Sequence, residues 1–180
     1  MPSLAYRLLV ACSIVAFAVA AWAQDNVTAH AQLIGLDGQP MGEATFTQGP
    51  TGVLILIQLH GAPPGPHGVH LHNVGKCDPA DGFDSAGSHI GADGGMHGLL
   101  AVEGPHAGDL PSIDVDAAGE ANVEFFNTWV EVMPGEMSFP LLDGVDGSSI
   151  VVHENADDQM TQPSGGSGGR IACGVIEATE

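Results

Sequence analysis

Two histidines, His70 and His72, stand two residues apart in a segment where apolar and polar residues alternate, Gly68-Val69-His70-Leu71-His72-Asn73-Val74. Such alternation predicts a β-strand, in which residues i and i+2 point to the same face. Both imidazoles would then face one way and could bind one metal ion, while Val69 and Leu71 face the core. The alternative is an exposed strand face that happens to carry two histidines.

A second group of metal-binding side chains lies in the stretch 75–111, which contains many Gly and Asp residues and no convincing strand. Its four candidate ligands are His89, His97, His106 and Asp109. Three imidazoles and one carboxylate complete a tetrahedral zinc set and leave no open position, so this set predicts a structural site. The strand-borne imidazoles that remain, which also suit copper, are His70, His72 and His153. Any single loop histidine could instead be only a hydrogen-bonding side chain, but that alternative is hard to sustain for all of them.

The elements that must position these side chains are expected to be strands. The 180 residues include 26 Gly and 12 Pro, and short apolar runs alternate with turn residues, which is typical of an all-β sandwich or barrel. Two loops are long enough to expect a function for them, 75–111 and 154–169. We interpret 62–66 as a rigid connection and 128–147 as a loose one without readable chemistry. The expected strands span 27–35, 42–48, 52–59, 68–74, 113–116, 121–126, 148–153 and 171–176.

The charge balance limits the partners. Asp and Glu total 22 against 3 Lys and Arg, which gives a formal net charge of −19. A chain this acidic is not expected to bind nucleic acid or an anionic membrane surface, because both would repel it.

The first 23 residues are expected to be a cleaved secretory signal. Arg7 precedes an apolar run, and Ala21-Trp22-Ala23 forms a small-x-small cleavage site. A retained membrane anchor is the alternative, but the run from 8 to 21 is shorter than the ~20 residues that a spanning helix needs. We therefore expect one exported domain, 24–180, which is periplasmic or secreted and has no stable membrane anchor.

Export also bears on the cysteines. The domain keeps Cys77 and Cys173, and two cysteines in an oxidising compartment favour a disulfide over two free thiols.

Five motifs together resemble the copper–zinc superoxide dismutases of the exported bacterial kind, over nearly all of 24–180. They are Gly65-Pro66-His67-Gly68-Val69-His70-Leu71-His72, Ser85-Ala86-Gly87-Ser88-His89, His106-Ala107-Gly108-Asp109-Leu110-Pro111, Ile150-Val151-Val152-His153-Glu154-Asn155-Ala156-Asp157-Asp158 and Gly169-Arg170-Ile171-Ala172-Cys173-Gly174-Val175-Ile176. The resemblance implies an eight-stranded Greek-key β-barrel, grouped with immunoglobulin-like sandwiches, with four strands before the first long loop and four after it.

The resemblance also implies a ligand set, with one copper and one zinc per chain. Copper would be held by His70, His72, His89 and His153. Zinc would be held by His89, His97, His106 and Asp109, so that His89 would bridge the two metals. It further implies the disulfide Cys77–Cys173, which would tie the first long loop to the last strand.

Two further residues receive roles from the resemblance. Asp157 would link a copper histidine to a zinc histidine by hydrogen bonds, and such partners fix ring orientation and tautomer. Arg170 would guide the anionic substrate and, with His89, form the catalytic pair. The alternatives are a solvated loop carboxylate for Asp157 and a surface ion pair for Arg170. His67 would be structural, behind the copper site.

The implied activity is the disproportionation of superoxide to O₂ and H₂O₂, with copper alternating between Cu(II) and Cu(I) and with a histidine-bridged structural zinc. The alternative is an exported copper- or zinc-binding protein, a reservoir or carrier without turnover. A copper-only dismutase would require missing zinc ligands, and none is missing. Relatives of this kind occur as monomers and as homodimers, and the sequence favours neither.

Overall fold

We analysed a computed structural model of the chain, which describes residues 28–135, 139–143 and 146–179. The expected signal segment, residues 1–23, lies outside the described residues.

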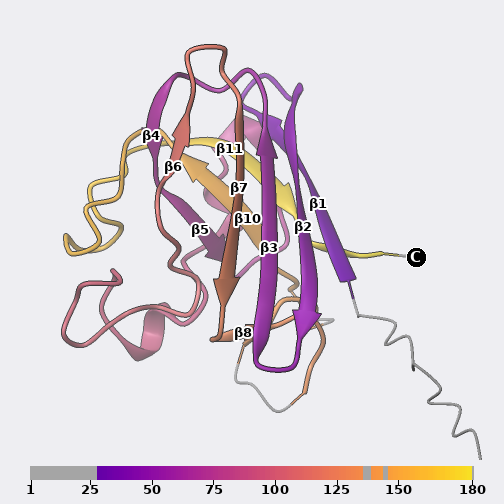
Figure 1. Ribbon diagram of the computed structural model, residues 1–180, viewed down its shortest axis with the longest axis vertical. Helices are drawn as coiled ribbons and strands as arrows, with labels where there is room; N and C mark the ends of the chain where they lie inside the picture. Colours follow the sequence, from indigo (N-terminus) through magenta and orange to yellow (C-terminus); the bar gives the residue numbers. More distant parts are fainter. Residues whose placement is uncertain (1–27, 136–138, 144–145, 180) are drawn as a thin grey trace, which may run out of the picture.

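Strands are the main regular elements of the described part of the chain, and long loops join them (Figure 1). Their bounds are β1 Thr28–Gly35, β2 Pro40–Gly49, β3 Gly52–Leu59, β4 Gly65–His67, β5 Val69–His72, β6 Ile113–Val115, β7 Ala121–Asn127, β8 Val130–Glu131, β9 Phe139–Pro140, β10 Ser149–His153, β11 Arg170–Val175 and β12 Glu177–Ala178. The largest sheet has the order β5-β10-β11-β1-β2-β3-β7, with β12 added to β1. All of its pairings are antiparallel.

This curled sheet is the Greek-key barrel that the sequence predicts. After β3, the chain crosses to β5 at the far end of the sheet order and then returns to form β7, which pairs with β3 at the near end. β4 and β6 form a separate antiparallel pair. If β4 and β5 are taken as one strand interrupted at Gly68, four main strands precede the first long loop and four follow it within the described residues.

The strands form where apolar residues alternate with polar or exposed ones. In β3, Val53, Ile55, Ile57 and Leu59 enter the core while the residues between them face outward or are only half-buried, as a period of two requires. β5 and β10 differ, because every residue in both is buried. The long loops cover the outer face of these two strands, so the histidines of these strands are shielded from solvent.

The structure adds two features that the sequence analysis did not predict. The 62–66 connection ends in β4, whose residues pair with β6. The 128–147 connection contains β8 and β9, which pair in parallel. Both pairings involve only two or three residues per strand, too few for an alternating pattern to be visible in the sequence.

The two long loops lie on the same side of the barrel, to the left in Figure 1. The first contains three short 3₁₀ helices, η1 Pro79–Asp81, η2 Asp84–Ala86 and η3 Ala92–Gly94, and no strand among its described residues. The disulfide Cys77–Cys173 joins it to β11 and confirms the predicted bridge, with the two Cα atoms 5.6 Å apart.

None of the described residues forms a helix that is long and apolar enough to cross a membrane.

Candidate metal centre

Three of the predicted ligands come from neighbouring strands. β5 lies beside β10, with His70 opposite Val151 and His72 opposite Ser149. His153 ends β10 at a shift in the β10–β11 register. All three imidazoles are nearly completely buried, at 0%, 1% and 3% exposure. The sheet register therefore brings together side chains that are about 80 residues apart in the sequence.

Each of these three rings has one nitrogen engaged and one nitrogen without a partner. His70 Nε2 lies 2.8 Å from Asp157 Oδ2, His72 Nδ1 donates to Gly87 O at 3.0 Å, and His153 Nδ1 lies 3.3 Å from Gly168 O. The opposite nitrogens, His70 Nδ1, His72 Nε2 and His153 Nε2, are buried and have no hydrogen-bond partner among the described residues. A buried polar atom without a partner is costly. Three such lone pairs in one place fit a metal ion.

His89 completes this group. Ligand atoms of His70, His72, His89 and His153 all lie within 4.8 Å of one another. His89 is held there by an isolated bridge to His72 and by the hydrogen bond from Ile90 N to Leu71 O. Four buried imidazoles around one point suit copper.

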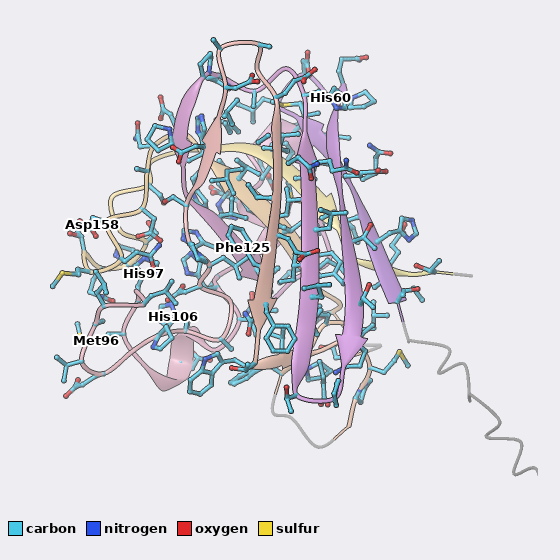
Figure 2. All side chains as sticks on the ribbon, in the orientation of Figure 1. His60, Met96, His97, His106, Phe125 and Asp158 are labelled. Carbon is cyan, nitrogen blue, oxygen red and sulfur yellow. A yellow bond between two sulfur atoms is a disulfide. The ribbon has the colours of Figure 1, made fainter. Side chains whose placement is uncertain are left out.

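The other nitrogen of His89 faces the loop-borne group. Its Nδ1 lies 2.9 Å from Asp109 Oδ1, and two more imidazole nitrogens approach the same oxygen, His97 Nδ1 at 3.0 Å and His106 Nδ1 at 3.5 Å. Figure 2 shows His97 and His106 on the loop side of the barrel, far from His60. Three nitrogens converging on one carboxylate oxygen form the donor set that a zinc ion needs.

A second grouping of ligand atoms overlaps this set. His70, His89, His97 and Asp109 also place atoms within 4.8 Å of one another. We favour His106 over His70 for the zinc set, because the unpartnered Nδ1 of His70 belongs to the first group. The outer nitrogen of His106 is already engaged, 3.1 Å from Gly95 O, which turns its Nδ1 inward.

Asp157 connects the two groups. Its carboxylate lies 2.8 Å from His70 Nε2 and 3.0 Å from His97 Nε2, and it is buried. Burial acts to raise its pKa, but the hydrogen bonds with His70 and His97 outweigh this and hold the pKa well below its usual value. The position and bonds expected of Asp157 are therefore present, and it is not a solvated loop carboxylate.

Burial is the main cause of the pKa shifts of His70, His72, His89 and His153. Desolvation lowers the pKa of His153 to about 3 and that of His89 to about 4, with neighbouring imidazoles adding to the effect. Burial also lowers the pKa of His70 and, more strongly, that of His72. These rings are thus neutral at pH 7, which is the form that binds metal.

His97 behaves in the opposite way. Burial acts to lower its pKa, but hydrogen bonds to Asp109 and Asp157 outweigh burial and raise the pKa to about 9. Asp109 is itself strongly acidic, because its bonds with His89, His97 and the Gly98 N–H outweigh burial and lower its pKa. The loop-borne group therefore holds a proton at pH 7 that a bound metal ion would replace.

An open cleft of about 370 Å³ leads to the first group. It is lined by His72, His89, His153, Gln162 and Arg170. Arg170 is half-buried, and its guanidinium donates to Phe83 O at 2.6 Å and to Gly87 O at 2.8 Å. These bonds aim a fixed positive charge into the cleft, so Arg170 is not a surface ion pair.

The structure brings every candidate site residue to this one place. His67 lies behind it, with Nδ1 2.7 Å from His153 O. Sequence reasoning missed the glutamines Gln159 and Gln162, whose side chains bind the backbone of the loop-borne segment. An isolated glutamine in a polar loop carries no signal that could have identified it.

The fold and site define a class of protein: a β-barrel with two adjacent groups of side chains that could hold metal ions and that share His89. The family model described as "Copper/zinc superoxide dismutase (SODC)" matches residues 40–176. The chain belongs to the copper/zinc superoxide dismutase family.

Individual relatives agree with this assignment. The chain is 46% identical over 142 residues to "Superoxide dismutase [Cu-Zn]" of Caulobacter vibrioides, covering 78% of this chain and 80% of that protein. It is 40% identical over 158 residues to "Superoxide dismutase [Cu-Zn] 2" of Aquifex aeolicus, covering 87% and 90%. A crystal structure of a SOD-like protein from Bacillus subtilis superposes with a TM-score of 0.74 at 35% identity, covering 81% of this chain and 95% of that one.

Proposed function

We propose that the chain catalyses the disproportionation of superoxide, 2 O₂•⁻ + 2 H⁺ → O₂ + H₂O₂, at the two-metal centre. The copper ligands are His70, His72, His89 and His153. The zinc ligands are His89, His97, His106 and Asp109. The observation that carries the proposal is the set of three buried, unpartnered imidazole nitrogens beside a cleft that also holds a fixed arginine. A structural role alone would not leave those nitrogens without partners.

Copper, when bound, supplies the one-electron redox chemistry, and zinc supplies a fixed positive charge beside it. The chain's own residues orient both. Asp157 fixes the His70 ring by accepting from Nε2, and Gly87 O does the same for Nδ1 of His72. The lone pairs on the opposite nitrogens are thereby aimed at one point.

Arg170 attracts the substrate. Superoxide is an anion, and the chain carries a formal charge of −19, so the average field repels it. A cation in the wall of the cleft acts on a small ion there more strongly than distant carboxylates do. Among the described residues, Arg170 is the one Lys or Arg that lines the cleft, which makes it the residue that steers superoxide inward.

His89 is the residue that can exchange a proton with the cleft. It lines the cleft, and its Nδ1 is engaged on the Asp109 side. Its Nε2, on the opposite side of the ring, is the atom at which a proton can be held for a departing peroxide.

The alternative of a metal reservoir or carrier without turnover is not favoured. Such a protein has no need of a fixed cation beside the metal ligands, and Arg170 is present and held by two backbone carbonyls.

The protein is exported, periplasmic or secreted, after cleavage of residues 1–23, and 24–180 then forms the domain without a stable membrane anchor. The disulfide Cys77–Cys173 supports export, since such bonds persist in oxidising compartments. N-terminal sequencing of protein from the exported fraction should begin at Gln24. A molar-mass measurement on the same sample distinguishes a monomer from a homodimer.

The activity is tested by measuring copper, zinc and superoxide consumption on one purified sample. We expect one copper and one zinc per chain together with rapid turnover. Full occupancy by both metals without turnover would instead support the reservoir or carrier.

A further inference from the structure

The side chain of Gln162, in the second long loop, makes two hydrogen bonds to the backbone of His97 in the first. The backbone N–H of His97 donates to Oε1 of Gln162 at 2.9 Å, and Nε2 of Gln162 donates to the backbone carbonyl of His97 at 2.9 Å. Nε2 also donates to Met160 O at 3.0 Å within its own loop. With both ends of the amide engaged, the orientation of Gln162 is fixed.

His97 needs such support from outside its own segment. It lies between Gly94-Gly95 and Gly98, whose φ of 111° only glycine adopts readily, and its segment belongs to no strand. Among the described residues, the backbone N–H and C=O of His97 have no hydrogen-bond partner other than Gln162. Among the described residues, Gln162 is therefore the residue that binds both backbone groups of His97, while the flanking N–H groups of Met96 and Gly98 donate to Glu103 O and Asp109 Oδ2.

Gln159 supports the next turn of the same segment. Leu99 N donates to its Oε1 at 3.1 Å, Leu100 N donates to its backbone carbonyl at 3.2 Å, and its Nε2 donates to Leu110 O at 3.0 Å. Gln159 has φ of 64°, a left-handed conformation that is unfavourable for a residue with a side chain. The surrounding bonds maintain this conformation, which sets the loop against the zinc-side segment.

The backbone of His97 controls the position of its ring. Nδ1 lies 3.0 Å from Asp109 Oδ1 and Nε2 lies 3.0 Å from Asp157 Oδ1, so the ring spans the two carboxylates. A small tilt would lengthen at least one of these contacts, because the two oxygens lie on opposite sides of a rigid ring.

We propose that Gln162 is a positioning residue for the zinc half of the centre: it clamps the backbone of His97 so that the ring is held between Asp109 and Asp157. The proposal rests on the assignment of His97 as a zinc ligand in the function proposed above. Loss of the clamp is expected to weaken zinc binding about 10- to 100-fold, the range typical of residues that orient a metal ligand.

The test compares two glutamines changed in the same way. Gln162→Met keeps the length of the side chain and removes both bonds to His97. Gln48→Met is the matched control, because Gln48 also binds backbone groups, accepting from Val132 N and donating to Gly49 O and Gly52 O, but at the barrel strands. Zinc affinity is measured by chelator competition on copper-free protein, and Co²⁺ is then used as a spectroscopic probe of the zinc site.

We expect Gln162→Met to weaken zinc binding and to shift the Co²⁺ absorption bands, while Gln48→Met changes neither even if it lowers Tm. Wild-type affinity and bands in Gln162→Met, or an equal loss in both variants, would overturn the proposal. His97→Ala tests the ligand assignment separately from the clamp. If this variant retains wild-type zinc affinity, the assignment of His97 as a zinc ligand fails. If it loses zinc while Gln162→Met does not, only the clamp fails.

Discussion

The two halves of the metal centre are built by different means. The strand-borne half, His70, His72 and His153, is positioned by the hydrogen bonds of β5, β10 and β11. The loop-borne half, His97, His106 and Asp109, belongs to a segment without strands. Its backbone is held mainly by side chains, apart from an isolated bridge between Asp109 and His70 of β5. Asp109 Oδ2, for example, accepts from the N–H groups of both Gly98 and His106.

This difference also shows in the hydrogen bonds of the rings in each half. The strand-borne rings each have one buried nitrogen without a hydrogen-bond partner among the described residues, and the sheet brings these three nitrogens together. The loop-borne rings instead approach the Asp109 carboxylate, and the hydrogen bonds of His97 with Asp109 and Asp157 outweigh burial and raise the pKa of His97 to about 9. The strand half is thus preorganised by the barrel, whereas the loop half must exchange a proton for its metal.

The largest expected effect comes from removing a strand-borne ligand. His153→Ala should lower copper affinity by more than about 100-fold and reduce turnover to background, because ligand loss exceeds the loss of an outer partner. The sheet should persist, since β10 keeps its backbone pairing. Metal analysis and a superoxide assay measure the effect, with His30→Ala on the exposed face of β1 as the control. Wild-type copper affinity in His153→Ala would contradict the assignment of His153 as a copper ligand.

The disulfide should matter mainly to the loop half. The double variant Cys77→Ser, Cys173→Ser opens a crosslink that spans 96 residues, which is worth about 4–5 kcal/mol in the chain-entropy model. Denaturant unfolding of the metal-free protein measures this loss. Hydrogen exchange should quicken in 75–111 while β10 stays protected, and equal acceleration in both regions would contradict the division into two halves.

Zinc binding should depend on pH where copper binding does not. With a pKa of about 9, His97 is protonated at pH 7 and must lose that proton to bind zinc, so zinc affinity should rise about tenfold per pH unit from pH 7 to 9. The strand-borne rings have lowered pKa values and are already neutral, so copper affinity should be level over this range. Calorimetry in two buffers of different ionisation enthalpy counts the released proton.

The smallest expected effect concerns the cleft. Arg170→Ala should lower kcat/KM by about tenfold and weaken its dependence on ionic strength, because the steering charge is lost. Lys76→Ala makes the same change of charge at an exposed residue that does not line the cleft, and should leave kcat/KM nearly unchanged. Equal effects of the two variants would show that the net charge of the protein, and not the charge in the cleft, governs the approach of superoxide.

The sequence predicts the strand half better than the loop half for a physical reason. Alternation around His70 and His72 reflects the two faces of a strand, and the run ending at His153 is apolar because it is buried. The loop ligands could be recognised as a donor set, but nothing in the sequence places Gln162 against His97. Bonds between a side chain and a distant backbone group follow no periodicity. The same holds for β8 and β9, which are too short to produce a pattern.

The central claim is that one barrel holds two metals that share His89, and anomalous diffraction at the copper and zinc absorption edges tests it most directly. Crystals of protein loaded with both metals should give a copper peak among His70, His72, His89 and His153, and a zinc peak among His89, His97, His106 and Asp109. A single peak, or both elements at one position, would contradict the account.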